Sequence, residues 1–215
     1  MAAGRLIIWK TAVWIGCLTP LALLVAEAFG LRGMSLGANP VEMVLHTTGK
    51  TGLNILFISL AVTPARVLTG INQLIRLRRP LGLFSFFYIV LHFVTYAALD
   101  LRLDFSMLYT DITMRPYITV GMAALAGMIP LAVTSTSGMQ RRLGRRWVTL
   151  HRAVYGIAIL GLIHFFWQVK IDIREPLVYA VILTFLLGFR VVRAIRLRRR
   201  RRLAVGQATA ARSDR

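Results

Sequence analysis

The chain alternates between long runs of apolar side chains and short polar segments rich in arginine. The runs show no strict alternation of apolar and polar positions, and most approach the roughly 20 residues with which an α-helix crosses a bilayer. Because water inside a bilayer cannot satisfy bare backbone groups, such runs predict helices. The predicted spans are Ile7–Phe29, Thr51–Leu68, Leu81–Leu99, Pro116–Thr134, Ala153–Trp167 and Leu177–Val192, the fifth being short unless it begins near Leu150.

Composition agrees with this pattern. Of 215 residues 57% are hydrophobic, the mean hydropathy is +0.65 and the formal net charge is +19. Such a chain is too apolar for an ordinary soluble domain and too basic for a plain apolar core. We therefore predict an all-α, polytopic membrane protein: one six-helix bundle over residues 1–195, followed by a basic tail over 196–215.

The charges predict how the bundle lies in the membrane. Most Lys and Arg residues fall on the side of the N-terminus, the second and fourth connections and the C-terminal tail. The opposite side carries only Arg32, Lys50, Arg102, Arg115, Lys170 and Arg174. By the positive-inside rule both termini are cytoplasmic, in a multi-pass protein of a bacterial inner membrane.

The run RLRRRRR at residues 196–202 has two interpretations. It is either a binding segment for nucleic acid or an anchor on anionic membrane lipid. Because it directly follows a predicted membrane helix, we favour the lipid anchor and expect no nucleic-acid partner.

The first apolar segment also has features of a cleavable signal peptide: Arg5, Lys10, an apolar stretch and AEA at 26–28. It is long for that role and contains Pro20, so we favour an uncleaved first helix. The single cysteine, Cys17, allows neither an internal disulfide nor an iron–sulfur cluster. The sequence shows no internal repeat, no phosphate-binding glycine loop and no Ser/His/Asp arrangement.

Two of the four histidines lie at matching depths in predicted membrane helices. His92 is eight residues before Asp100 and His164 six before Lys170. At 1.5 Å per residue these positions are ~12 and ~9 Å below the outer boundary. Ionisable side chains inside membrane helices mark functional sites, and two imidazoles at one depth predict the axial ligands of one haem iron. The expected walls are Phe93, Tyr96 and Ala97 near His92, and Gly161, Phe165 and Phe166 near His164.

The alternative for each histidine is a hydrogen bond that only joins two helices. For one isolated histidine we would favour that alternative, whereas for a depth-matched pair we favour haem.

His151 lies ~20 Å from His164 along a helix axis and about 140° around it, so the two cannot share a metal ion. The third predicted helix offers no histidine opposite it, only Arg78, Arg79 and Pro80. His151 is therefore either an interfacial side chain or part of an inner redox site for a second haem, FMN or quinone, walled by Trp147 and Tyr155. In the second case electrons enter near His151 and leave from the outer haem.

His46, in HTTGKTG at 46–52, lies near the outer entry to the second predicted helix. It either donates a hydrogen bond to a quinone or a haem propionate, or merely belongs to the turn.

Four segments carry a family resemblance over nearly the whole chain in unbroken order. They are GANPVEMVLHTTGKTGL (37–53), RRPLGLFSFFYIVLHFVTY (78–96), TSTSGMQRRLGRRWVTLHRAVY (134–155) and LIHFFWQVKIDIREPLVYA (162–180). With them the chain closely resembles the MsrQ (YedZ) family, the haem-binding membrane subunits of bacterial methionine sulfoxide reductase systems, within the ferric-reductase-like transmembrane group.

The resemblance implies a ferric-reductase-like haem-binding domain over residues 1–195 with b-type haem and FMN, and family histidine ligands at His92, His151 and His164. It implies electrons from the respiratory quinone pool or a cytosolic flavin reductase, delivered to MsrP, the periplasmic molybdenum-containing catalytic subunit, for repair of oxidised periplasmic proteins. The chain would then be the electron-transfer subunit of an oxidoreductase complex, its cofactors supplying the chemistry.

Two other classes remain as alternatives: a small transporter and a structural membrane anchor without a redox cofactor. A transporter predicts charged or interrupted helices at mid-membrane, and the predicted spans carry no acidic residue in their middle. A structural anchor needs no histidines at matched depth.

Overall fold

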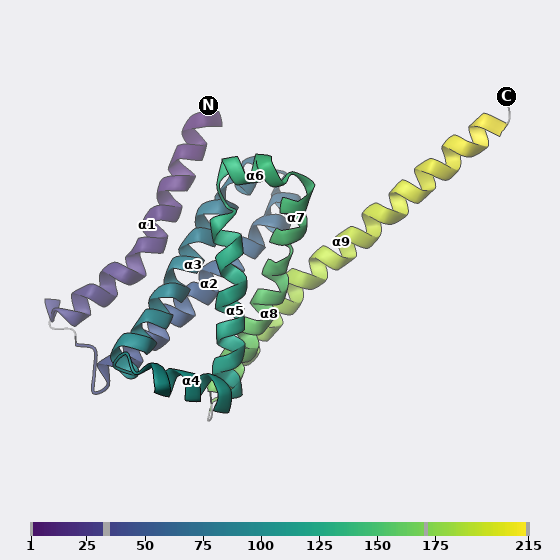
Figure 1. The fold of residues 1–215 in the computed structure, drawn as a ribbon. Helices are drawn as coiled ribbons and strands as arrows, with labels where there is room; N and C mark the ends of the chain where they lie inside the picture. The colour runs from purple at the N-terminus through teal and green to yellow at the C-terminus, as the bar shows by residue number, and fades with distance from the viewer. Residues whose placement is uncertain (1, 32–34, 170–171, 214–215) are drawn as a thin grey trace.

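Every regular element of the computed structural model, which describes residues 2–31, 35–169 and 172–213, is helical (Figure 1). Six segments are long and apolar enough to cross a membrane, which confirms the predicted all-α six-helix fold. The long helices are α1 (Ala2–Ala28), α2 (Pro40–Thr69), α3 (Arg78–Thr95), α5 (Pro116–Val133), α8 (Ala153–Gln168) and α9 (Arg174–Ser213). Shorter helical elements are η2 (Asn72–Leu77), η3 (Tyr96–Asp100), α4 (Phe105–Met114), α6 (Ser137–Leu143) and α7 (Arg145–His151).

Several helices extend beyond the apolar runs that predict them. α2 begins at Pro40, eleven residues before the predicted Thr51, because Asn39 caps the helix by accepting a hydrogen bond from the Glu42 amide and Pro40 suits the first helical position. His46 therefore lies on a helix and not in a turn. α9 continues unbroken across residue 195, so the division into a bundle and a tail stays a prediction. Arg32 and Lys170, used in the charge count and the depth estimate, lie outside the described residues.

α2 is the central helix of the bundle. One face packs with α8 and α9 around Leu56 and Ala158, in a cluster that also contains Leu53, Phe57, Leu60, Phe165, Leu183 and Leu186. Its other face packs with α1 and α3, where Ile55 and Val62 meet Cys17, Leu81, Phe84 and Tyr88. A third cluster, Ala124, Met128 and Ile157, joins α5 to α8. The most extensive helix contacts lie within two antiparallel pairs, α2 with α3 and α5 with α8.

A side chain of the core binds α1 by forming hydrogen bonds with two backbone groups of that helix. The hydroxyl of Tyr88 on α3 donates to the Cys17 carbonyl oxygen (2.6 Å) and accepts from the Leu21 amide (3.1 Å). These two backbone groups are an i, i+4 pair beside Pro20, where the helical ladder is weakest.

α4 is a short helix within a stretch that the sequence analysis treats as a connection between two spans. Figure 1 shows it running across one end of the bundle, between the ends of α3 and α5. Asp104 caps it by accepting hydrogen bonds from the Ser106 and Met107 amides. We call this end, where α2 and α5 also begin, the outer end. That it faces the periplasm stays a prediction from the charges.

Candidate functional site

A cavity of about 300 Å³ lies in the outer half of the bundle, between α2, α3, α5 and α8. Its walls are mainly apolar and contain three glycines, which leave room between the helices. The lining residues are Glu42, Leu45, His46, Gly49, Lys50, Leu53, Ile89, His92, Phe93, Tyr96, Asp100, Arg115, Tyr117, Ile118, Gly121, Met122, Ala124, Leu125, Gly161, His164, Phe165 and Gln168. The cavity thus contains three of the four histidines.

His92 and His164 meet across this cavity from α3 and α8. Their ring centres are 6.2 Å apart and the ring planes are inclined by 79°. Nδ1 of His92 lies 3.0 Å from the Leu45 carbonyl oxygen, and Nδ1 of His164 lies 2.7 Å from that of Tyr117. A carbonyl oxygen can only accept, so each Nδ1 carries the proton and the lone pair of each Nε2 stays available to a metal.

This donor set fits a haem iron. The hydrogen bond from Nδ1 to a backbone carbonyl is the outer support typical of metal-binding histidines. Because a metal–nitrogen bond is about 2 Å long, a separation of 6.2 Å between the ring centres leaves room for one metal ion between the two imidazoles. Among the described residues no three His, Cys, Asp or Glu side chains gather as ligands. A bare ion would lack a third protein ligand here, whereas haem iron needs only axial ligands from the protein.

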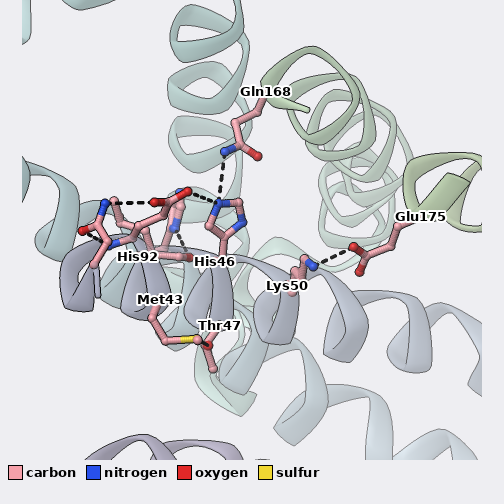
Figure 2. A network of polar contacts seen from close by, with 10 residues as sticks. Met43, His46, Thr47, Lys50, His92, Gln168 and Glu175 are labelled. Atoms are coloured by element: carbon pink, nitrogen blue, oxygen red, sulfur yellow. Dashed lines mark hydrogen bonds and ion pairs between the residues drawn. The ribbon is translucent and has the colours of Figure 1, made fainter. Parts of the chain in front are cut away.

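Several polar side chains also line the cavity, and Figure 2 shows the contacts of three of them, His46, Lys50 and Gln168. Nε2 of His46 lies 3.6 Å from a carboxylate oxygen of Glu42 and 3.5 Å from the side-chain nitrogen of Gln168. One helical turn further along α2, Lys50 pairs with Glu175 of α9 at 2.6 Å. The Lys50 ammonium also lies 5.9 Å from the centre of the Phe165 ring. His46 is therefore a residue at the edge of the same cavity, with 34% of its side chain exposed.

A second cluster of polar side chains lies at the edge of the cavity, beside α4. The carboxylate of Asp111, which is only 4% exposed, accepts a hydrogen bond from the Tyr96 hydroxyl (2.5 Å) and pairs with Nε of Arg115 (3.1 Å). A hydrogen bond with Tyr117, and less strongly the Asp111 carboxylate, raise the pKa of Arg115 above its ordinary value. Arg115 therefore contributes a permanent positive charge to the lining of the cavity.

His151 lies apart from this cavity, at the end of α7. Its Nε2 is 3.0 Å from the Thr134 hydroxyl, and its ring stacks on Trp147 with ring centres 4.0 Å apart. The Trp147 indole in turn donates to the Thr134 carbonyl oxygen. Tyr155, the other expected wall residue, lies beneath the guanidinium of Arg190 at 5.3 Å. The structure thus brings His46, His92 and His164 to one cavity and leaves His151 in a separate polar cluster.

Comparison with known proteins identifies the family. Residues 48–162 match the family described as "Ferric reductase like transmembrane component". A protein of Rhodospirillum rubrum is 50% identical over 193 residues, which cover 88% of this chain and 90% of that protein. Relatives in Xanthomonas campestris pv. campestris and Xanthomonas oryzae pv. oryzae are 48% and 47% identical, covering 88% and 94% of this chain and 88% and 95% of their own lengths. All three are named protein-methionine-sulfoxide reductase heme-binding subunit MsrQ.

The chain belongs to the MsrQ family. With its six apolar helices it is a multi-pass membrane protein, as the sequence predicts. The stretch shared with the ferric-reductase-like family runs from the third turn of α2 to Leu162 in α8. It contains α3 with His92, all of α5 and most of α2 and α8, and it ends two residues before His164.

Sequence reasoning missed the groups that hold the two central histidines. Leu45, Gly49 and His92 each have a counterpart 72 residues later, in Tyr117, Gly121 and His164. Thr47 and Phe93 also recur at that spacing, as Thr119 and Phe165. A search for pairs at a constant offset, rather than for contiguous repeats, could have found this signal. Sequence reasoning also missed Asp111 and Gln168, because no motif marks these two residues.

Proposed function

We propose that this MsrQ-family chain is the haem b electron-transfer subunit of a methionine sulfoxide reductase system. In this role it passes electrons from the quinone pool or a cytosolic flavin reductase to MsrP, the periplasmic molybdenum-containing catalytic subunit, for repair of oxidised periplasmic proteins. The observation that carries the proposal is the pair of imidazoles, 6.2 Å apart across one cavity, with both Nδ1 atoms bonded to backbone carbonyls.

His92 and His164 are the axial ligands in this proposal. Each Nδ1–H bond fixes the ring orientation and keeps the tautomer whose Nε2 can coordinate iron. A haem bound between them supplies a one-electron carrier within the membrane. The apolar side chains of Leu53, Ile89 and Phe165 line the pocket and would limit the access of water to a bound haem.

The polar residues at the edge of the cavity have a separate role. Lys50 and Arg115 are the two cations that line the cavity, and both already face carboxylates, Glu175 and Asp111. They suit the neutralisation of haem propionates, since a carboxylate bound at the membrane boundary requires a cation. His46 is the candidate hydrogen-bond donor to a propionate or to a quinone at the mouth of the cavity, with Glu42 and Gln168 within reach of its ring.

In the proposal, an inner redox site passes electrons from the donor to this outer site. His151, held by Thr134 and stacked on Trp147, lies towards the opposite end of the bundle and is a candidate ligand or wall for a second haem, FMN or quinone. FMN itself is proposed from the family resemblance alone. The proposed inner-membrane orientation places this end towards the cytosolic donor and the arginine-rich tail on anionic lipid.

Purified protein tests the proposal through its visible spectrum. We expect a haem b spectrum, and we expect His92→Ala or His164→Ala to remove the outer haem while the helical bundle persists, since loss of one axial ligand weakens retention of the ring. Haem content, the reduced-minus-oxidised spectrum and circular dichroism measure the two effects separately. Unchanged haem content in both variants would overturn the ligand assignment, and a colourless wild-type protein would favour the transporter or the structural anchor.

A further inference from the structure

The two histidines are held by the same local structure, repeated in the two antiparallel helix pairs. In the first pair the carbonyl of Leu45 on α2 accepts from His92 on α3; in the second, that of Tyr117 on α5 accepts from His164 on α8. Each acceptor precedes its histidine by 47 residues. Four residues after each acceptor, one helical turn further, lies a glycine: Gly49 or Gly121.

These two glycines lie directly against the imidazoles. A Cβ at Gly49 would stand 3.0 Å from Nδ1 and 3.2 Å from Cε1 of His92. At Gly121 it would stand 2.7 Å from Nδ1 and 2.9 Å from Cε1 of His164. The glycine is therefore what allows the ring to reach the carbonyl one turn before it on the facing helix. Neither glycine has a positive φ angle, so backbone conformation does not explain why glycine occupies these two positions.

We propose that Gly49 and Gly121 are positioning residues for the haem ligands: each provides the gap through which a ligand imidazole donates Nδ1–H to the facing helix and presents Nε2 to the iron. This inference rests on the proposed assignment of His92 and His164 as axial ligands. It goes beyond that assignment because it explains what orients the two rings.

An added methyl group acts on the ring and not on the helix. The imidazole cannot yield as the free end of a flexible chain does, because Nδ1 is bonded to a carbonyl and Nε2 would be bonded to iron. Alanine must therefore break or lengthen one of these bonds. Removing the outer support of a metal-binding histidine typically lowers metal affinity or activity roughly 10–100-fold. The closer contact predicts the larger loss for Gly121→Ala.

The same two helix pairs offer matched controls. A Cβ at Gly52 would meet Ile89 of α3 at 2.7 Å, and one at Gly127 would meet Ile157 of α8 at 3.0 Å. Gly52→Ala and Gly127→Ala therefore crowd the same two helix contacts without touching an imidazole. Gly156→Ala on α8 meets no atom within 4 Å and serves as the neutral control.

The experiment measures haem per protein, haem affinity and the binding of carbon monoxide to the reduced haem, in membranes and after purification. Iron with two histidine ligands has no free axial position, so wild type should not bind carbon monoxide. We expect Gly49→Ala and Gly121→Ala to lose about 10–100-fold in haem affinity, and their residual haem to bind carbon monoxide. Added imidazole should restore the six-coordinate spectrum.

The outcomes distinguish failure of the positioning role of the glycines from failure of the ligand assignment. Equal haem loss in the two control variants Gly52→Ala and Gly127→Ala would show that helix spacing alone matters, and would overturn the positioning role. An unchanged affinity and no carbon monoxide binding in Gly49→Ala and Gly121→Ala would also overturn it. Spectra of membranes keep the test valid for a variant that does not survive purification. If His92→Ala and His164→Ala retain wild-type haem, the ligand assignment itself has failed.

Discussion

Asp111 is the one strongly buried carboxylate among the described residues, and its removal should loosen the outer end of the bundle. Its side chain joins three elements: α4, on which it lies, η3 through the Tyr96 hydroxyl, and the start of α5 through Arg115. Asp111→Ala leaves the Tyr96 hydroxyl without its acceptor and Arg115 without its counter-ion. Because both residues line the cavity, the change should weaken haem retention as well as stability.

The size of the effect follows from the two contacts. A hydrogen bond to a charged group contributes about 1.5–3 kcal/mol. The ion pair adds only about 0–1 kcal/mol, because the Arg115 side chain is 50% exposed and solvent screens it. We therefore expect Asp111→Ala to cost roughly 2–4 kcal/mol, and Asp111→Asn, which keeps an acceptor for Tyr96, to cost much less.

Asp104→Ala on the same helix is the matched control. Asp104 is exposed and only caps α4, so its loss should cost about 1 kcal/mol. Equilibrium unfolding in mixed detergent micelles, followed by circular dichroism, measures the free energy of unfolding of each variant. A cost for Asp111→Ala no larger than that for Asp104→Ala would refute the reasoning. So would a Tyr96→Phe, Asp111→Ala double variant whose loss equals the sum of the single losses, because contacting partners should couple by 0.5–3 kcal/mol or so.

Two further predictions concern the path of electrons and the orientation of the bundle. His151→Ala should block reduction of the proposed outer haem by the physiological donor while dithionite still reduces it, because His151 lies in a polar cluster separate from the outer cavity. Normal electron delivery to the proposed periplasmic reductase in this variant would make His151 a purely interfacial residue. Reporter fusions at the C-terminus and near Arg79 should read cytoplasmic, and fusions near Asp104 and Asp172 periplasmic, since arginine is concentrated on one side. A periplasmic C-terminus would reverse both the predicted topology and the side on which the proposed partner MsrP would dock.

The elements of this protein could be predicted from the sequence because they depend on local properties. Long apolar runs in a bilayer must satisfy their backbone groups internally, so the six helices follow from hydropathy alone. The matching depth of His92 and His164 follows from the rise per residue of a helix. Helix ends were less accurate, since the start of α2 depends on the cap at Asn39 and not on an apolar residue.

The tertiary structure decided what surrounds the histidines. No local pattern shows that Gly49 faces His92 or that Gly121 faces His164, because the partners are 43 residues apart and meet only when their helices pack. In the sequence Asp111 lies in a connection between two predicted spans, and it becomes a buried partner of Tyr96 only because α4 folds across the end of the bundle. Hydropathy determines which segments enter the membrane, whereas the azimuth of each helix, and hence the direction in which each imidazole points, depends on close side-chain packing between helices distant in the sequence.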